Sequence, residues 1–112
     1  MNDPVGEVLA ALADGTRRSI VRQLADGAMP TATELARDMP ISRQAISKHL
    51  RVLEDAHLVD IQRRGREARY RLRPEPLGLA EAWLSEVGTA WDHRLALLKT
   101  LSESADGDHA RP

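Results

Sequence analysis

The central segment of the chain is Ser42-Arg43-Gln44-Ala45-Ile46-Ser47-Lys48-His49-Leu50-Arg51-Val52-Leu53-Glu54. At about 100° per residue, a helix through this segment gathers its polar and basic side chains within an arc of about 140°. These side chains are Arg43, Gln44, Ser47, Lys48 and Arg51. Ser42 is a favourable N-cap, because its hydroxyl can accept a hydrogen bond from a free backbone N–H of the first turn. This face has no acidic side chain before Glu54, which favours binding to a polyanion. Its polar side chains suit a polyanion that presents base edges for hydrogen bonding.

A short helix is predicted directly before this segment. Residues 31–34 fit a capping box, in which Thr31 bonds forward to the backbone and Glu34 reaches back. The helix continues through Leu35 to about Asp38, and Pro40 prevents it from going further. A short helix, a tight turn and a second helix with a polar and basic face form a helix-turn-helix pattern.

The period of the apolar residues changes after His57. Val59 and Ile61 alternate with polar residues, and so do Tyr70 and Leu72, which predicts a β-hairpin. Its loop is Arg63-Arg64-Gly65-Arg66-Glu67, in which glycine can adopt a positive φ. Three arginines at the tip of a projecting element suit contact with phosphate or insertion into a minor groove. The alternative is a solubilising tip, for which acidic residues would serve equally well.

Helical spacing of apolar residues predicts further helices over 3–13, 16–25 and 77–102. The last of these carries an apolar stripe at three- and four-residue steps, made of Leu77, Leu84, Val87, Trp91, Leu95, Leu98 and Leu101, with Trp83 beside it. So small a core cannot cover this stripe, and we expect the same helix of a second subunit to do so. The alternative is a helix folded back onto its own domain. One domain over residues 1–102 is expected, with residues 103–112 forming a disordered tail.

Composition excludes several classes of protein. The chain of 112 residues is 42% apolar and holds two Trp, one Tyr and no Phe, so the core is expected to be aliphatic. The absence of Cys excludes disulfides, thiolate metal sites and a thiol nucleophile. No apolar run approaches the roughly 20 residues of a membrane span, and no signal pattern opens the chain. A soluble cytoplasmic protein with no membrane partner is therefore expected.

The net charge of −1 hides an uneven distribution. Residues 42–73 carry nine basic and four acidic side chains, a net charge of +5. Residues 1–41 carry four basic and six acidic ones, a net charge of −2, and residues 74–112 carry three and seven, a net charge of −4. A basic block between acidic ends is typical of a nucleic-acid-binding surface. The alternative is a charged surface segment without a partner.

With this order of elements, the chain resembles the ArsR-type winged helix-turn-helix repressors from about residue 5 to residue 101. The matching residues are Leu12-Ala13-Asp14-Gly15-Thr16-Arg17-Arg18, Glu34-Leu35-Ala36, Ser42-Arg43-Gln44-Ala45-Ile46-Ser47-Lys48-His49-Leu50, Val52-Leu53, and Gly65-Arg66 with Tyr70. The chain also resembles a branch of the family that lacks the metal sites. The residues that match this branch are Pro74-Glu75-Pro76-Leu77, Trp83-Leu84 and Trp91. The chain departs from the family at Gly15, where Pro is frequent, and at Pro40, where Gly is common.

The resemblance implies a mainly α fold with a small β-hairpin wing. It also implies a homodimer joined by the first and last helices, with two recognition helices in successive major grooves. The expected dimer-interface residues are Val5, Val8, Leu9, Leu84, Val87, Trp91, Leu95 and Leu98. Metal sensors of the family use a Cys-containing motif on the helix that holds Glu34, or Asp and His residues spaced along the last helix. This chain has no Cys and offers only the adjacent pair Asp92-His93 there, so neither metal nor cofactor is expected.

The predicted function is sequence-specific binding of double-stranded DNA by a transcriptional repressor with a near-palindromic operator. Gln44 is expected to pair with adenine and Arg43 or Lys48 with guanine, and lesser contacts are expected from Ser42 and Ser47. Phosphate or groove contacts, which supply affinity rather than sequence choice, are expected from Arg51, Arg63, Arg64, Arg66 and Arg69. Because His49 falls near the middle of the apolar arc, packing is favoured over DNA contact for it.

Two other functions share this pattern. One is a sensor whose small apolar effector binds between the terminal helices, where Trp83 and Trp91 either line a pocket or belong to the packed interface. The other is an adaptor whose winged helix binds protein. Catalysis is not expected, because the chain lacks Cys, a glycine-rich phosphate loop and a carboxylate pair with a nearby His on defined elements.

Overall fold

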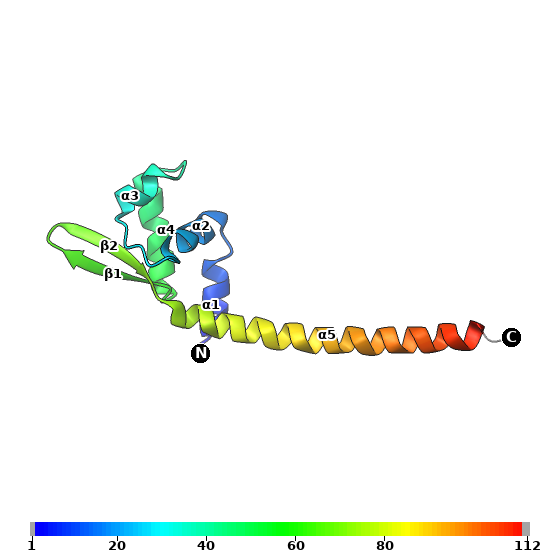
Figure 1. Cartoon of the computed structure of the whole chain (residues 1–112). Coiled ribbons are helices and arrows are strands. Elements are labelled where there is room, and N and C mark those ends of the chain that lie inside the picture. Colours follow the sequence, from blue (N-terminus) through cyan, green and yellow to red (C-terminus); the bar gives the residue numbers. More distant parts are fainter. Residues whose placement is uncertain (1, 111–112) are drawn as a thin grey trace. The chain divides into compact units, whose positions relative to one another are not determined.

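The computed structural model describes the backbone of residues 2–110 and the side chains of residues 2–104. The elements follow in the order α1 (Pro4–Ala11), α2 (Gly15–Leu24), α3 (Ala32–Arg37), α4 (Arg43–Asp55), β1 (Val59–Arg64), β2 (Glu67–Leu72) and α5 (Pro74–Ala110) (Figure 1). The chain forms two compact units, residues 1–80 and residues 81–112. The first unit holds the helix-turn-helix and the hairpin. The predicted mainly α fold with a β-hairpin wing is confirmed.

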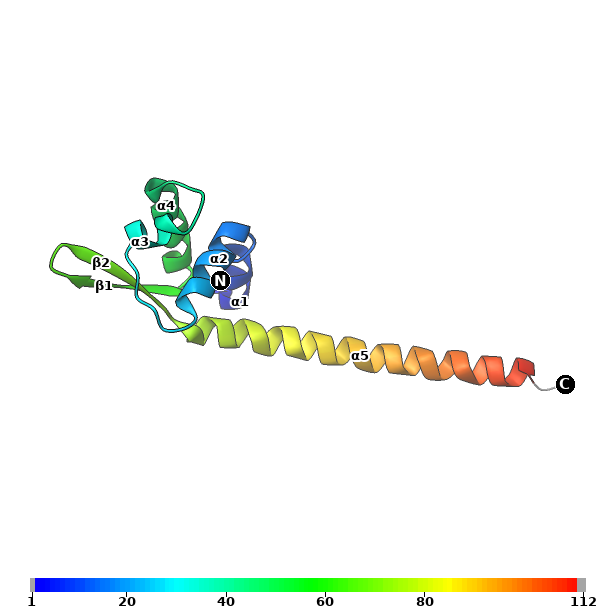
Figure 2. The same cartoon turned by 45° about the horizontal axis from the view of Figure 1, so that its top comes forward.

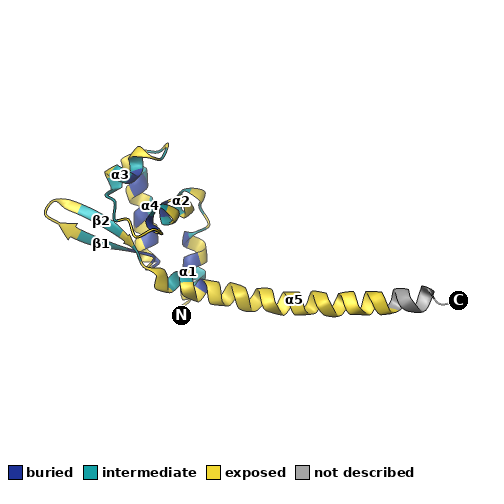
Figure 3. Cartoon of the chain, in the orientation of Figure 1, coloured by how far each residue is buried: buried dark blue, intermediate teal, exposed yellow. Residues whose placement is uncertain are grey.

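An aliphatic core holds the first unit together. Its side chains come from α1 to α4, from the segment between α4 and β1, from β1 and from the start of α5. They are Val8, Ala11, Ile20, Leu24, Leu35, Ile46, Leu50, Leu53, Ala56, Leu58, Val59 and Ala80. Burial follows the inner faces of these helices, which are dark blue in Figure 3. Val8 is 0% exposed within a single chain, so the prediction that it contacts a partner subunit is wrong. The helical period identified its apolar face but could not tell the domain core from an interface.

Side chains cap the helices that frame the turn. The predicted capping box is present: the Glu34 N–H donates to Thr31 Oγ1 at 3.1 Å, and the Thr31 N–H donates to Glu34 Oε2 at 3.4 Å. Ser42 is the N-cap of α4, where its Oγ accepts from the Ala45 N–H at 3.2 Å. Both caps satisfy backbone donors that the first turn of a helix leaves free. They fix where α3 and α4 begin, and therefore the length of the turn between them.

The hairpin has longer strands and a shorter turn than expected. β1 pairs with β2 in antiparallel register, with Ile61 opposite Tyr70 and Arg64 opposite Glu67. Only Gly65 and Arg66 are left to make the turn, and Gly65 has a φ of +61°, as predicted for a hairpin glycine. A two-residue turn with positive φ matches the twist of the two strands. The hairpin therefore carries Arg63 and Arg64 on a strand rather than in a loop.

α5 begins at Pro74, before the expected start at Leu77, because proline is tolerated in the first turn of a helix. It continues through Ala110, beyond the expected end at Ser102 and through most of the expected tail. Residues 111–112 and the side chains of residues 105–110 lie outside the described residues. Within a single chain, every side chain of residues 81–104 is exposed. No helix in the described part is long and apolar enough to cross a membrane.

Candidate nucleic-acid interface

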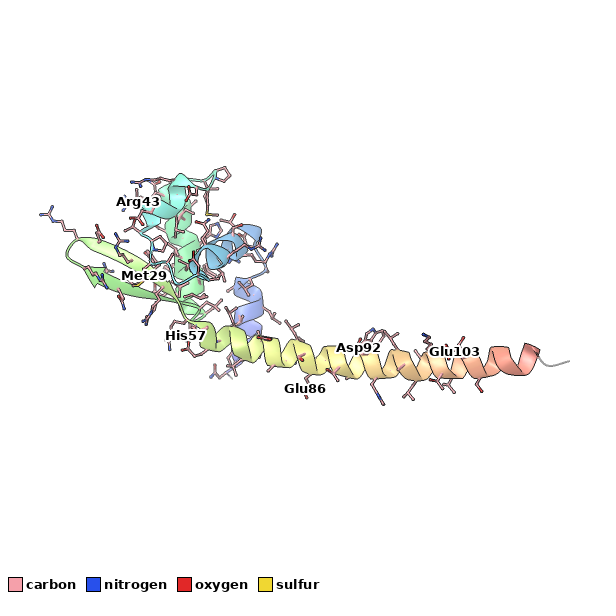
Figure 4. The ribbon with its side chains drawn as sticks, viewed as in Figure 1. Met29, Arg43, His57, Glu86, Asp92 and Glu103 are labelled. Carbon is pink, nitrogen blue, oxygen red and sulfur yellow. The ribbon has the colours of Figure 1, made fainter. Side chains whose placement is uncertain are left out.

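Helix α4 has one buried face and one exposed face. Ile46, Leu50 and Leu53 are 0% exposed and fasten the helix to the core. The polar and basic arc faces solvent, because Arg43, Gln44, Ser47, Lys48 and Arg51 are all exposed, as is the N-cap Ser42. Arg43 opens the helix and is labelled in Figure 4. The residues predicted to read DNA therefore share one accessible surface.

The hairpin projects from the helices of the first unit in both views (Figure 1, Figure 2). Between it and the helix-turn-helix lies a cleft of about 510 Å³, lined by Thr31, Ala32, Thr33, Glu34, Arg37, Arg43, Ser47, Arg63, Arg66, Glu67, Ala68 and Tyr70. A second hollow of about 370 Å³ is lined by Ser47, Arg51, Glu54, Asp55, Ile61, Arg63 and Tyr70. Ser47, Arg63 and Tyr70 line both. The structure thus brings predicted residues of α4 and of the hairpin together.

Five predicted residues line neither hollow, and one of them, Arg69, is described below. Ser42, Gln44 and Lys48 lie on the exposed surface of α4, and Arg64 lies near the hairpin tip. Sequence reasoning missed Arg37, which ends α3 and lines the larger cleft with an exposed side chain. A basic residue in the last turn of the helix before the recognition helix was the signal available for it. The position of α3 beside the hairpin, which brings Arg37 into the cleft, was not visible in the sequence.

Arg69, which was predicted to contact DNA, already has partners within the fold. Its Nη1 donates to the Met29 carbonyl oxygen at 2.8 Å, and its Nε donates to Glu67 Oε2 at 2.8 Å. Its Nη2 lies 2.8 Å from Glu67 Oε2 and 3.5 Å from Glu34 Oε1. The side chain is 28% exposed and its charge faces two carboxylates. Arg69 therefore ties β2 to α3 and to the loop before it.

His49 lies at the edge of the polar surface of α4, against the start of α2. Its Nδ1 is 3.3 Å from Arg17 Nη1 and 3.9 Å from Asp14 Oδ2, and its side chain is 24% exposed. Asp14 is the N-cap of α2, where its carboxylate accepts from the Arg17 N–H at 3.1 Å. This hydrogen bond lowers the pKa of Asp14 below its ordinary value, with further lowering from the Thr16 N–H and from the nearby His49 and Arg17. His49 thus contacts polar groups at the rim of the core.

The expected partner surface on α5 is exposed in the single chain. Leu84, Val87, Trp91, Leu95 and Leu98, which we call the α5 stripe, are between 46% and 56% exposed. On α1, Leu9 is exposed and Val5 is half-buried. Among the described residues, no group of three or more His, Asp or Glu side chains is placed to hold a metal ion.

Residues 12–62 match a family model described as a helix-turn-helix domain. A helix-turn-helix transcriptional regulator from Mycobacterium tuberculosis is 44% identical over 98 residues, which cover 88% of each chain. The solved structure of an ArsR-like transcriptional regulator from Rhodococcus sp. RHA1 is 41% identical, with a TM-score of 0.73, covering 88% of this chain and 92% of that one. A homodimeric winged helix-turn-helix DNA-binding domain from Mycobacterium bovis is 27% identical, with a TM-score of 0.62, covering 78% of this chain and 80% of that one.

Proposed function

The chain belongs to the ArsR-type winged helix-turn-helix transcriptional regulators, and we propose that it represses transcription by binding a near-palindromic operator as a homodimer. One observation carries the proposal. Arg43 and Ser47 of α4 line the same cleft as Arg63 and Arg66 of the hairpin, next to the exposed surface of α4. A recognition helix and a wing that share one basic cleft suit a duplex, whose base edges and phosphates lie side by side.

The readers we assign lie along the exposed surface of α4. Gln44 can form two hydrogen bonds with adenine, and Arg43 or Lys48 can form two with guanine. Each such pair discriminates against the wrong base by about 1–3 kcal/mol. Ser42 and Ser47 add weaker contacts with base edges or phosphates. Support comes from the buried face of α4, which leaves these side chains outward without competing contacts inside the core.

The phosphate contacts we assign are Arg51, Arg63, Arg64 and Arg66, and we add Arg37 because its exposed side chain lines the larger cleft. Arginine presents a planar fork of donors that matches a phosphate group. Such contacts release counterions from DNA, so they supply affinity that falls with salt and carry little sequence choice. Glu34 and Glu67 line the same cleft, and both are drawn toward Arg69, which offsets their charge.

We assign the second subunit to the α5 stripe, with Leu9 and Val5 of α1. A stripe of five large apolar side chains exposed on a single chain is typical of a protein–protein interface. The homodimeric Mycobacterium bovis domain supports the same assembly here. Two-fold symmetry then places the half-sites of the operator about 34 Å apart, which is one helical turn of DNA.

A gel shift at moderate salt with DNA from upstream of the protein's own gene tests the function. We expect a complex between the protein and the upstream DNA that survives an excess of random DNA. If random DNA competes for the complex as effectively as unlabelled upstream DNA does, the result instead favours the protein-binding adaptor.

A second candidate function is a sensor of a small amphipathic effector. A shallow hollow of about 470 Å³ on α5 is lined by Val87, Ala90, Trp91, His93, Arg94 and Leu97, which combine apolar surface with one fixed positive charge. Such a lining suits a small apolar molecule with an anionic group. Thermal shift with a metabolite library tests it: a ligand that stabilises the protein and weakens operator binding supports the sensor, and stabilisation without that effect argues against it.

A further inference from the structure

The Arg17 guanidinium joins α1, α2 and α4. From the first turn of α2, its Nε donates to the Ala11 carbonyl oxygen, and its Nη2 donates to the Ala10 carbonyl oxygen at 3.5 Å. Its Nη1 lies 3.3 Å from His49 Nδ1 on α4. The Ala10 carbonyl also accepts from the Ala13 N–H at 3.2 Å, and the guanidinium adds a donor at this end of α1 while reaching the recognition helix. Arg17 therefore fixes one edge of α4 relative to α1.

The contact between Arg17 and His49 requires one protonation state. A guanidinium only donates hydrogen bonds, so His49 must accept at Nδ1 and be neutral there. A proton on Nδ1 removes that acceptor and places two positive charges 3.3 Å apart. The Asp14 carboxylate, whose Oδ2 is 3.9 Å from the same nitrogen, is then the partner that favours the charged ring.

The charged groups that face His49 from α2 are thus Asp14 and Arg17, whereas α1 presents backbone carbonyls. Along α4 itself, the neighbouring Lys48 and Arg51 are exposed. The hydrogen bond from the Arg17 N–H that lowers the pKa of Asp14 keeps this carboxylate charged through the range in which imidazoles titrate. The two alternative partners of His49 are therefore both in place before it gains a proton.

We propose that Arg17 is a positioning residue for DNA reading, which holds α4 through neutral His49, and that proton uptake by His49 releases this hold. Because His49 directly follows Lys48 in α4, a movement of α4 at His49 also moves the side chains that we assign to base contacts. Operator binding therefore weakens at acid pH, by about fivefold, which corresponds to the loss of roughly one hydrogen bond. Binding to random DNA does not weaken, because it depends on charge rather than on the exact position of α4. This inference rests on the proposed function.

The test measures the affinity for a duplex selected in vitro by the protein and for a random duplex, at about pH 8 and about pH 5.5, the range over which an imidazole changes charge. His49→Gln keeps an acceptor for Arg17 but cannot gain a proton. It is expected to bind the selected duplex with the same affinity at both pH values, whereas His49→Ala binds it weakly at both. His57→Asn is the matched control, because His57 is exposed, has a φ of +61° that asparagine tolerates, and should leave the pH dependence intact.

A pH dependence that is the same in the wild type and in His49→Gln overturns the inference. A wild-type protein that binds selected and random duplexes equally at about pH 8 overturns the proposed function instead. Arg17→Lys keeps the positive charge but loses the several N–H donors of the guanidinium. Its affinity for the selected duplex is a second measurement, with Arg18→Lys as the control. Arg18 donates to the Leu12 carbonyl oxygen at 2.7 Å and so caps α1 as well, without a hydrogen bond to His49. Equal effects of the two substitutions would reduce Arg17 to a cap of α1 and contradict the positioning role.

Discussion

Arg69 on β2 donates a hydrogen bond of 2.8 Å from Nη1 to the backbone carbonyl oxygen of Met29, in the loop that leads to α3 (Figure 4 labels Met29). The same guanidinium faces Glu34 and Glu67. The Tyr70 N–H adds a backbone hydrogen bond to the Pro30 carbonyl oxygen at 2.9 Å. The second strand of the wing is therefore attached to the helix-turn-helix, and Arg63 and Arg66 of the wing line one cleft with Arg43.

Arg69→Ala is expected to destabilise the protein by about 1–2 kcal/mol, because it removes a hydrogen bond to a carbonyl and leaves two carboxylates without the cation they share. Urea unfolding followed by circular dichroism measures this change. Arg71→Ala is the matched control: Arg71 is 48% exposed and forms one surface ion pair with Asp60 at 2.8 Å, so its loss should cost less than about 1 kcal/mol. Equal losses for the two variants would remove Arg69 from the attachment of the wing.

Gln44→Ala is expected to lose discrimination between operator and random DNA by about 1–3 kcal/mol while it keeps most of its affinity for random DNA. The reason is that an uncharged reader contributes to sequence choice and little to the electrostatic part of binding. Fluorescence anisotropy with both duplexes at one salt concentration measures the ratio. Equal losses on both duplexes would show that Gln44 does not read a base.

Arg64→Ala is expected to lower the affinity for all DNA sequences and to flatten the dependence of binding on salt. Each lost phosphate contact reduces the slope of log K against log salt by about 0.9. Titrations of operator and random DNA at several salt concentrations measure it. If the slope does not change, Arg64 makes no phosphate contact, and the turn arginine Arg66 becomes the remaining candidate at the tip.

Trp91→Glu is expected to shift the protein from dimer to monomer, because it places a charge in the middle of the α5 stripe. Trp91 is 56% exposed in the single chain, so the substitution removes no packing from the core of residues 1–80. Sedimentation equilibrium measures the assembly, and circular dichroism checks that the fold is kept. Asp92→Ala, one position along α5 and outside the stripe, should stay dimeric. A dimeric Trp91→Glu would move the interface elsewhere.

Local chemistry made much of the fold predictable from the sequence. The cap residues Thr31 and Ser42, and the turn glycine Gly65, act on their own neighbours in the chain, and the structure has each in the predicted role. The buried side of α4 was predictable for the same reason, because the helical period alone separates Ile46, Leu50 and Leu53 from the polar arc. These features depend on residues a few positions apart.

Features that depend on distant partners were not predictable. Arg69 resembles a free wing arginine until the fold brings Met29 and Glu34 to it. Val8 and Leu9 are adjacent apolar residues of one helix, and only packing shows that the first is in the core and the second is exposed. Arg37 needed the position of α3 beside the hairpin. Interactions across the fold therefore determine which candidate side chains have partners within the chain and which are exposed.

The central proposal is that two copies of α4, one from each subunit, bind the two halves of one operator. Selection of DNA duplexes from a random pool by the purified protein, followed by sequencing, tests it. We expect an inverted repeat whose half-sites are about one helical turn apart, with an adenine and a guanine at fixed positions in each half. We also expect the pool selected by Gln44→Ala to lose the fixed adenine. Enrichment of a single half-site, or of no sequence at all, would show that two recognition helices do not bind one operator.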